Sequence, residues 1–141
     1  MRRFLSFCAI LLMLILLCSC SSNLGKPKLP VYFYYRTNTI PHGAQSSVIT
    51  TEVRDAAEYT DNYYDLLKEY FDGPQTNNCI SPFPSGTSLE DLNFRSTTVQ
   101  LVLSPHISNL SDSDFIIACA CITKTATELL GVNAVQICTS D

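Results

Sequence analysis

The sequence contains one strong candidate for covalent chemistry, a cysteine that could carry a lipid. Cys20 ends the run Leu17-Cys18-Ser19-Cys20, which follows an apolar segment that begins at Phe4, directly behind Arg2 and Arg3. This order of charged, apolar and small residues is typical of a secretory signal peptide. A small residue followed by a cysteine favours lipoprotein processing over a plain secretory cleavage site. We therefore expect cleavage before Cys20 and acylation of its thiol, with an uncleaved N-terminal anchor as the alternative.

A lipid on Cys20 would hold the protein on the extracytoplasmic face of a bacterial cell membrane. One acyl chain binds a membrane only marginally, so stable anchoring would need diacylation. We expect a signal peptide at 1–19, the lipidated cysteine and a tether at 20–30, and one domain at 31–141. The 141-residue chain has a net charge of −4, and loss of the signal peptide's two arginines makes it more acidic. This charge argues against nucleic acid as a partner.

Four further cysteines could form disulfides or bind a metal: Cys79, Cys119, Cys121 and Cys138. Outside the cytoplasm, four cysteines allow two disulfides in three connectivities. No CxxC pair or histidine cluster supports a metal site. Cys119 and Cys121 are two residues apart in a predicted helix and therefore point to different faces. We favour small buried hydrophobic residues for all four, and we expect no metal and no cofactor.

Catalytic residue sets are weakly represented. Ser104 and His106 place a hydroxyl near an imidazole, but they lie in a strand-to-helix connection without a nucleophile elbow. Asp112 and Asp114 could be calcium ligands, but the 12-residue calcium-loop pattern is absent. Their position at a predicted helix start is explained by the positive end of the helix dipole. We therefore expect a protein that is not an enzyme.

Tyrosines gather in the first half of the chain and are the candidate binding residues: Tyr32, Tyr34, Tyr35 and Tyr64. Exposed aromatic side chains are typical of surfaces that bind a protein or a glycan. Alternation along a strand places Tyr32 and Tyr34 on the face opposite Tyr35, so one of the two sets could be core. Core packing is the simpler interpretation, because aromatic residues are common in strands.

Two helices and five strands must position these residues. Thr60 or Asp61 can cap a first helix, which carries an apolar stripe over 63–71 and ends at Gly73-Pro74. Ser111 and Gly131 bound a second helix over 112–130. Its expected buried side consists of Phe115, Ala118, Cys119, Ile122, Ala126, Leu129 and Leu130.

Strands are expected at 31–35, 47–54, 89–94, 96–103 and 132–138, with a loop at 75–88. The predicted order is therefore β-β-α-β-β-α-β. This order predicts an α+β fold in which two helices pack on one face of a mixed or antiparallel sheet.

Five stretches in this order resemble the GerMN domain of GerM-type sporulation and spore-germination proteins. They are VYF at 31–33, LLKEYFDGP at 66–74, SPFPSGT at 81–87, VQL at 99–101 and the closing stretch at 127–137. The resemblance extends from Leu29 to Asp141 and implies a sandwich similar to ring-building motifs. Family members are commonly envelope proteins or lipoproteins, and the family implies no catalytic residues.

These observations predict a non-catalytic, membrane-anchored envelope lipoprotein. Its GerMN-like domain would bind another envelope protein or a second copy of itself, in sporulation, germination or envelope assembly. The alternative is a lipoprotein that binds a small molecule or a cell-wall fragment, and this alternative rests on the tyrosine-rich first half.

Overall fold

The computed structural model describes residues 30–38, 47–55 and 62–140. Its elements are β1 (Val31–Thr37), β2 (Ile49–Arg54), α2 (Tyr63–Asp72), β3 (Cys79–Ile80), β4 (Leu89–Arg95), β5 (Thr98–Leu103), the 3₁₀ helix η2 (Pro105–Asn109), α3 (Asp112–Leu130) and β6 (Ala134–Thr139). The α+β class and the predicted order are confirmed. The structure adds the two-residue strand β3, inside the stretch expected to be a loop, and η2.

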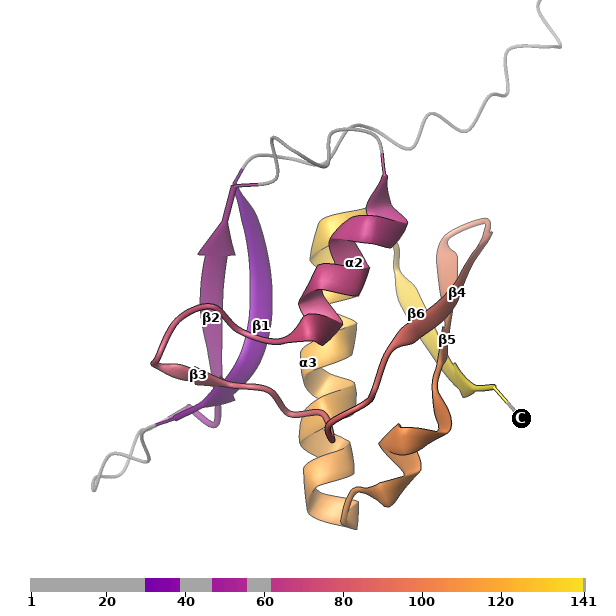
Figure 1. Cartoon of the computed structure of the whole chain (residues 1–141). Helices are drawn as coiled ribbons and strands as arrows, with labels where there is room; N and C mark the ends of the chain where they lie inside the picture. The colour runs from indigo at the N-terminus through magenta and orange to yellow at the C-terminus, as the bar shows by residue number, and fades with distance from the viewer. Residues whose placement is uncertain (1–29, 39–46, 56–61, 141) are drawn as a thin grey trace, which may run out of the picture.

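The strands form two sheets of three strands, where the sequence had suggested one sheet. One sheet has the antiparallel order β2-β1-β3, and the other has the order β4-β5-β6, with β6 parallel to β5. Figure 1 shows these sheets on either side of α2 and α3. The two helices therefore lie between the sheets.

The division into two sheets follows from the hydrogen bonds of β1. β3 pairs only with Arg36 and Thr37, so among the described residues no strand pairs with the earlier part of β1 on the side away from β2. There the Tyr34 N–H donates to the Thr125 hydroxyl of α3 at 3.0 Å, and the Tyr34 carbonyl accepts from the Tyr70 hydroxyl of α2 at 2.9 Å. Side chains of the two helices thus satisfy backbone groups that a further strand would otherwise pair.

Both helices begin at side-chain caps. The Asn62 carbonyl oxygen accepts from the backbone N–H groups of Tyr64 and Asp65, so Asn62 caps α2. The expected caps Thr60 and Asp61 lie outside the described residues. The predicted Ser111 cap of α3 is confirmed, and Gly131 ends that helix with the predicted left-handed backbone at φ 66°.

One side chain of α3 was placed wrongly by its periodicity. Phe115 was expected on the buried side, but it is 43% exposed. In Figure 1 the first turns of α3 extend past the strands, beside η2. Phe115 lies outside the buried stripe of α3, which consists of Ala118, Cys121, Ile122, Thr125 and Ala126.

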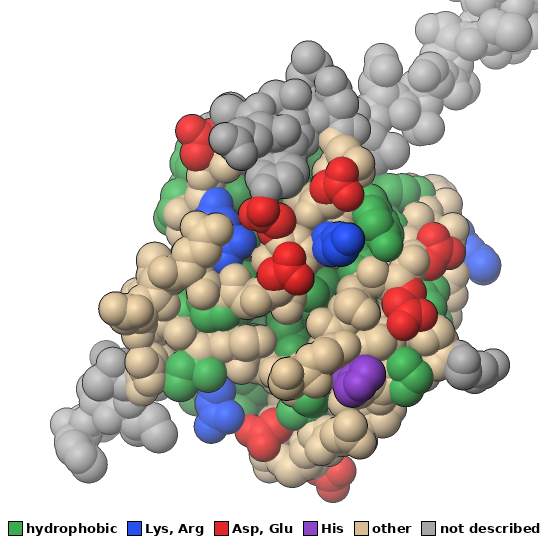
Figure 2. Space-filling view, viewed as in Figure 1, with side chains coloured by type: hydrophobic (Ala, Val, Ile, Leu, Met, Phe, Trp, Pro, Cys, Tyr) green, Lys and Arg blue, Asp and Glu red, His purple; other side chains and the backbone are tan. Residues whose placement is uncertain are grey.

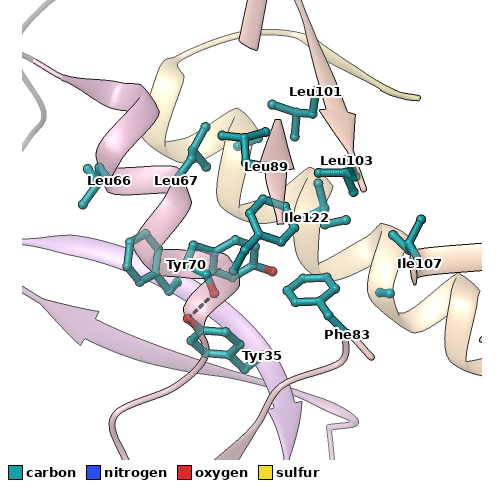
Figure 3. Packing of buried hydrophobic residues seen from close by; sticks show 14 of the residues in the cluster. Tyr35, Leu66, Leu67, Tyr70, Phe83, Leu89, Leu101, Leu103, Ile107 and Ile122 are labelled. Atoms are coloured by element: carbon teal, nitrogen blue, oxygen red, sulfur yellow. Dashed lines mark hydrogen bonds between the residues drawn. The ribbon is translucent and has the colours of Figure 1, made fainter. Parts of the chain in front are cut away.

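The core lies between the helices and both sheets. Figure 3 shows Leu67 of α2 beside Leu89 of β4, and Ile122 of α3 beside Leu103 of β5. Phe83 enters from the loop after β3, and its ring centroid lies 5.4 Å from that of Tyr70. This loop therefore contributes to the core. Within the described residues, no helix is both long and apolar enough to cross a membrane.

Candidate interaction surface

The outer face of β1 carries the first two candidate tyrosines. Antiparallel pairing places Val53 of β2 opposite Tyr32. Tyr32 is 40% exposed and Val53 is 55% exposed. Residues opposite each other in a sheet share one face, so the two side chains form an exposed aromatic–aliphatic pair. Ile80 of β3, which pairs with Arg36, is also 44% exposed.

Tyr34 continues this face but is held by α3. Its hydroxyl donates to the Glu128 carboxylate at 2.6 Å, and the Lys124 ammonium lies 4.7 Å from its ring centroid. The hydrogen bond to Glu128, with partial burial, raises the pKa of Tyr34. Tyr34 is therefore a half-buried side chain that positions α3 against β1.

An ion pair joins the next outward residue of β1 to the start of α3. Arg36 Nη1 lies 2.9 Å from Asp114 Oδ1, and both side chains are about 40% exposed. An exposed pair of this kind contributes about 0–1 kcal/mol to stability. We call the surface formed by Tyr32, Tyr34, Arg36 and Val53 the β1 surface. Asp114 of α3 neutralises Arg36, the one cation of the β1 surface.

The other two candidate tyrosines lie elsewhere. Tyr35 is fully buried, and its hydroxyl donates to the Tyr70 carbonyl at 2.9 Å, as Figure 3 shows. Burial raises its pKa. Tyr35 is therefore a core residue and cannot belong to a binding surface. The Tyr64 hydroxyl donates to the Leu89 carbonyl at 3.1 Å and so ties α2 to β4. The four tyrosines do not form one cluster.

A second exposed apolar feature lies on α3 and was not identified from the sequence. Ile116 is 68% exposed, although it stands in the apolar run at 115–122. A helix that is apolar around its whole circumference is usually buried on all sides. The apolar run therefore gave no signal that Ile116 would be exposed.

A buried charged cluster joins β2 to the turn after α2. The Glu52 carboxylate is 2% exposed and accepts from the backbone N–H groups of Gln75 and Thr76 at 2.9 and 2.8 Å. Arg54 donates to Glu52 through Nε at 2.6 Å and to the Gly73 carbonyl at 2.7 Å. Burial opposes ionisation of Glu52, but the hydrogen bonds from Thr76 and Arg54 outweigh it and lower its pKa. The hydrogen bonds within this cluster satisfy its charged groups, so its role is to hold β2 against the turn after α2.

Ser104 and His106 hold the loop that carries Phe83. The Ser104 hydroxyl donates to the Gly86 carbonyl and accepts from the Ser88 N–H, each at 3.0 Å. His106 Nδ1 lies 3.3 Å from the Ser104 hydroxyl oxygen, and its ring packs against Gly86. The serine is 4% exposed and fully engaged. This arrangement gives the pair a structural role.

All four described cysteines are free thiols. Burial raises the pKa of Cys119, and it raises that of Cys121 to about 12. A thiol with a raised pKa is a poor nucleophile and a poor metal ligand at neutral pH. Among the described residues, no three or more His, Cys, Asp or Glu side chains are grouped as a metal site would require.

Two shallow depressions border the loop after β3. One, of about 510 Å³, lies between the end of α2 and Gly86, and the other, of about 270 Å³, lies beside Arg36 and Asp114. Neither depression is lined by Tyr32, Tyr34, Tyr35 or Tyr64. These two depressions therefore do not support the tyrosines as a ligand site.

Comparison with known proteins identifies the family. A family model named Germane and described as "Sporulation and spore germination" matches residues 30–139. The chain belongs to the Germane family. The matched residues span β1 to β6, so the whole described fold is the Germane domain.

One solved structure shares this fold at low identity. The tandem GerMN domains of the sporulation protein GerM from Bacillus subtilis match at 17% identity and a TM-score of 0.55, over 87% of this chain and 42% of that one. A "Putative Lipoprotein" from Clostridium perfringens matches at 19% identity and a TM-score of 0.49, over 84% of this chain and 78% of that one. A comparison with curated proteins found no match. The predicted GerMN-type domain is confirmed.

Proposed function

We propose that this protein is a lipid-anchored envelope protein whose Germane domain binds another protein and performs no catalysis. The observation that carries the proposal is the family match, because it covers residues 30–139 and the family is described as "Sporulation and spore germination". The lipobox-like run before Cys20 supports anchoring on the extracytoplasmic face of the cell membrane.

The described surface supports binding more than chemistry. Tyr32 and Val53 expose an aromatic and an aliphatic side chain side by side, whereas Ser104 is buried and hydrogen-bonded. Aromatic residues are enriched at the centres of protein interfaces. The small-ligand alternative rested on a cluster of tyrosines, and those tyrosines are dispersed over β1, the core and the junction of α2 with β4.

Anchoring is tested by fractionating cells that produce the wild-type chain or the Cys20→Ser variant. The wild type should sediment with membranes, and the variant should be soluble and keep its thermal stability, because Cys20 lies outside the described domain. Membrane retention of the variant would contradict lipid anchoring.

Partner binding is tested by crosslinking in intact cells, followed by capture of the tagged full-length chain. We expect a defined adduct with an envelope protein in sporulating or vegetative cells. Recovery of uncrosslinked chain alone under both conditions would contradict the binding role.

A further inference from the structure

One buried hydroxyl in the loop after β3 has no hydrogen-bond partner. Thr87 is 7% exposed, and its Oγ1 is the only buried side-chain nitrogen or oxygen of the described residues that bonds to no other described group. Most buried polar groups in proteins are hydrogen-bonded, because burial removes them from water. An exception of this kind indicates a partner from outside the domain, either a water molecule or a ligand.

The loop that carries Thr87 is fixed on both sides of this residue. The Thr87 N–H donates to the Pro84 carbonyl at 3.1 Å. Ser104 holds the two neighbours of Thr87, because its hydroxyl donates to the Gly86 carbonyl and accepts from the Ser88 N–H. The Thr87 hydroxyl is therefore left over in a loop whose backbone is well bonded, and a ligand would meet a preorganised wall.

Thr87 lines the depression of about 510 Å³ at the end of α2. A water molecule occupies about 30 Å³, so this space admits a larger ligand, and its volume is in the usual range of small-molecule sites. Four of its lining residues carry a side-chain hydroxyl: Ser81, Ser85, Thr87 and Ser88. The other lining residues are apolar, a glycine and one carboxylate: Phe71, Phe83, Pro84, Gly86 and Asp72.

The charge of this depression argues against an anionic ligand. None of the described residues that line it is Lys, Arg or His, and Asp72 is the one charged residue among them. The chain has a net charge of −4, and Figure 2 shows further acidic side chains over α2 and β4. A phosphate or carboxylate in the depression would lack a counter-ion and would be repelled by this surface. The ligand is therefore neutral or cationic.

The hydroxyl groups favour a sugar over an amine. A serine or threonine hydroxyl both donates and accepts, and so does each hydroxyl of a sugar, whereas an ammonium group only donates. The Asp72 carboxylate only accepts, and it can take hydrogen bonds from two neighbouring sugar hydroxyls. Phe83 and Pro84 add apolar surface for the C–H groups of a sugar ring.

We propose that this depression binds a neutral sugar, with Thr87 and Asp72 as its hydrogen-bonding residues. No residue of the β1 surface lines the depression, so this site goes beyond the proposed protein-binding function and does not depend on it. A free sugar and one unit of a glycan chain share this chemistry, and the test distinguishes the two.

The test measures the melting temperature of the full-length chain, purified in mild detergent, with and without three probes. The probes are N-acetylglucosamine, its β-1,4-linked tetramer and the diamine putrescine. A ligand that binds the folded state raises the melting temperature, and we expect this rise with sugar and not with putrescine. A rise with both sugars supports a free sugar as the ligand, and a rise with the tetramer alone supports a glycan chain. No rise with either sugar, or a rise with putrescine alone, would overturn the inference.

Thr87→Val separates the binding role from a structural one. It keeps the shape of the side chain and removes the unpartnered hydroxyl. It should therefore weaken sugar binding about tenfold and leave the melting temperature of the sugar-free protein unchanged or higher. A hydroxyl that serves the fold alone would give the opposite result, a lower melting temperature with unchanged sugar binding, and that result would contradict the site.

Two further variants complete the test. Asp72→Asn keeps the size of an exposed side chain, and it should weaken sugar binding without changing the melting temperature of the sugar-free protein. Thr123→Val makes the same change as Thr87→Val at an exposed position of α3, and as the matched control it should alter neither quantity. Crosslinking to an envelope protein should persist in all three variants, so a failure of the sugar site and a failure of the proposed function are distinguishable.

Discussion

Glu52 provides the sharpest test of how this fold is held together. Its side chain is 2% exposed, and Oε2 accepts from the Gln75 N–H, the Thr76 N–H and the Thr76 hydroxyl, the last at 2.7 Å. Oε1 accepts from Arg54, whose side chain is 8% exposed. Glu52→Gln keeps the volume but removes the charge and turns an amide N–H₂ toward groups that are themselves donors.

The expected cost follows from the loss of one partner in a buried ion pair. Breaking such a pair costs about 3–5 kcal/mol because a charge stays buried without its counter-ion. The amide oxygen of the variant side chain would still accept some of the hydrogen bonds. Arg54 would keep the Gly73 carbonyl and the Glu69 carboxylate, which lies 3.7 Å from Nη1. We therefore expect Glu52→Gln to lower the free energy of unfolding by about 3 kcal/mol. Urea denaturation followed by circular dichroism measures this change.

The same variant predicts a pH dependence. The pKa of Glu52 is lower in the folded state than its ordinary value of 4.5, so the carboxylate stabilises the fold above that pH. This contribution is lost as the pH falls through the folded-state pKa. The difference between the wild type and Glu52→Gln should be complete at neutral pH and should shrink below about pH 4.5.

The control for Glu52 is Glu90→Gln, which removes an equal charge from an exposed position of β4. It should change the free energy of unfolding by no more than about 0.5 kcal/mol. Equal effects of the two variants, or a difference that does not depend on pH, would refute the account of the buried cluster.

Three further changes test other parts of the fold. Phe83→Ala should lower the free energy of unfolding by about 3–5 kcal/mol in denaturant titrations, because this 8%-exposed ring packs on Tyr70 and Phe71. Ser111→Ala should lower the free energy of unfolding by about 1 kcal/mol in the same titrations, because it removes the N-cap of α3. Ser111→Asp should keep most of that stability, because aspartate can also cap a helix. Gly86→Ala should lower the melting temperature, because φ is +89° there and the new Cβ would lie 3.1 Å from the His106 ring. An unchanged melting temperature of Gly86→Ala would show that the contact of His106 with Gly86 does not stabilise that loop.

Local signals in the sequence predicted the helices well. The bounds of α3 follow from Ser111 and Gly131, and both residues act through hydrogen bonds and backbone angles within a few residues. β5 and β6 followed from alternation and from the turn residues around them. The cap of α2 shifted to Asn62, because several adjacent residues have side chains able to cap and only the final geometry selects one.

Long-range contacts account for what the sequence did not reveal. The division into two sheets depends on Thr125 meeting Tyr34, and these residues are 91 positions apart. β3 has only two residues, and they form a strand because they meet Arg36 and Thr37 of β1. The strand propensity of a residue carries no information about which distant residue it will pair with.

The candidate binding residues show the same limit. Alternation correctly separated Tyr32 and Tyr34 from Tyr35, but it could not say which face would be covered. The exposure of Val53 depends on its cross-strand position opposite Tyr32, which no local pattern of β2 reveals. Burial of Glu52 depends on the turn at Gln75 and Thr76, more than twenty positions away.

The central claim is that the anchored Germane domain binds a protein through an exposed surface. A photo-crosslinking amino acid at position 53, opposite Tyr32, tests it most directly in cells that produce the full-length chain. The control position is Lys68, which is exposed on α2. The account predicts a discrete adduct with an envelope protein from position 53, a weaker or absent adduct from position 68, and loss of the adduct in the Cys20→Ser background. Absence of any adduct from position 53, or equal adducts from both positions, would contradict it.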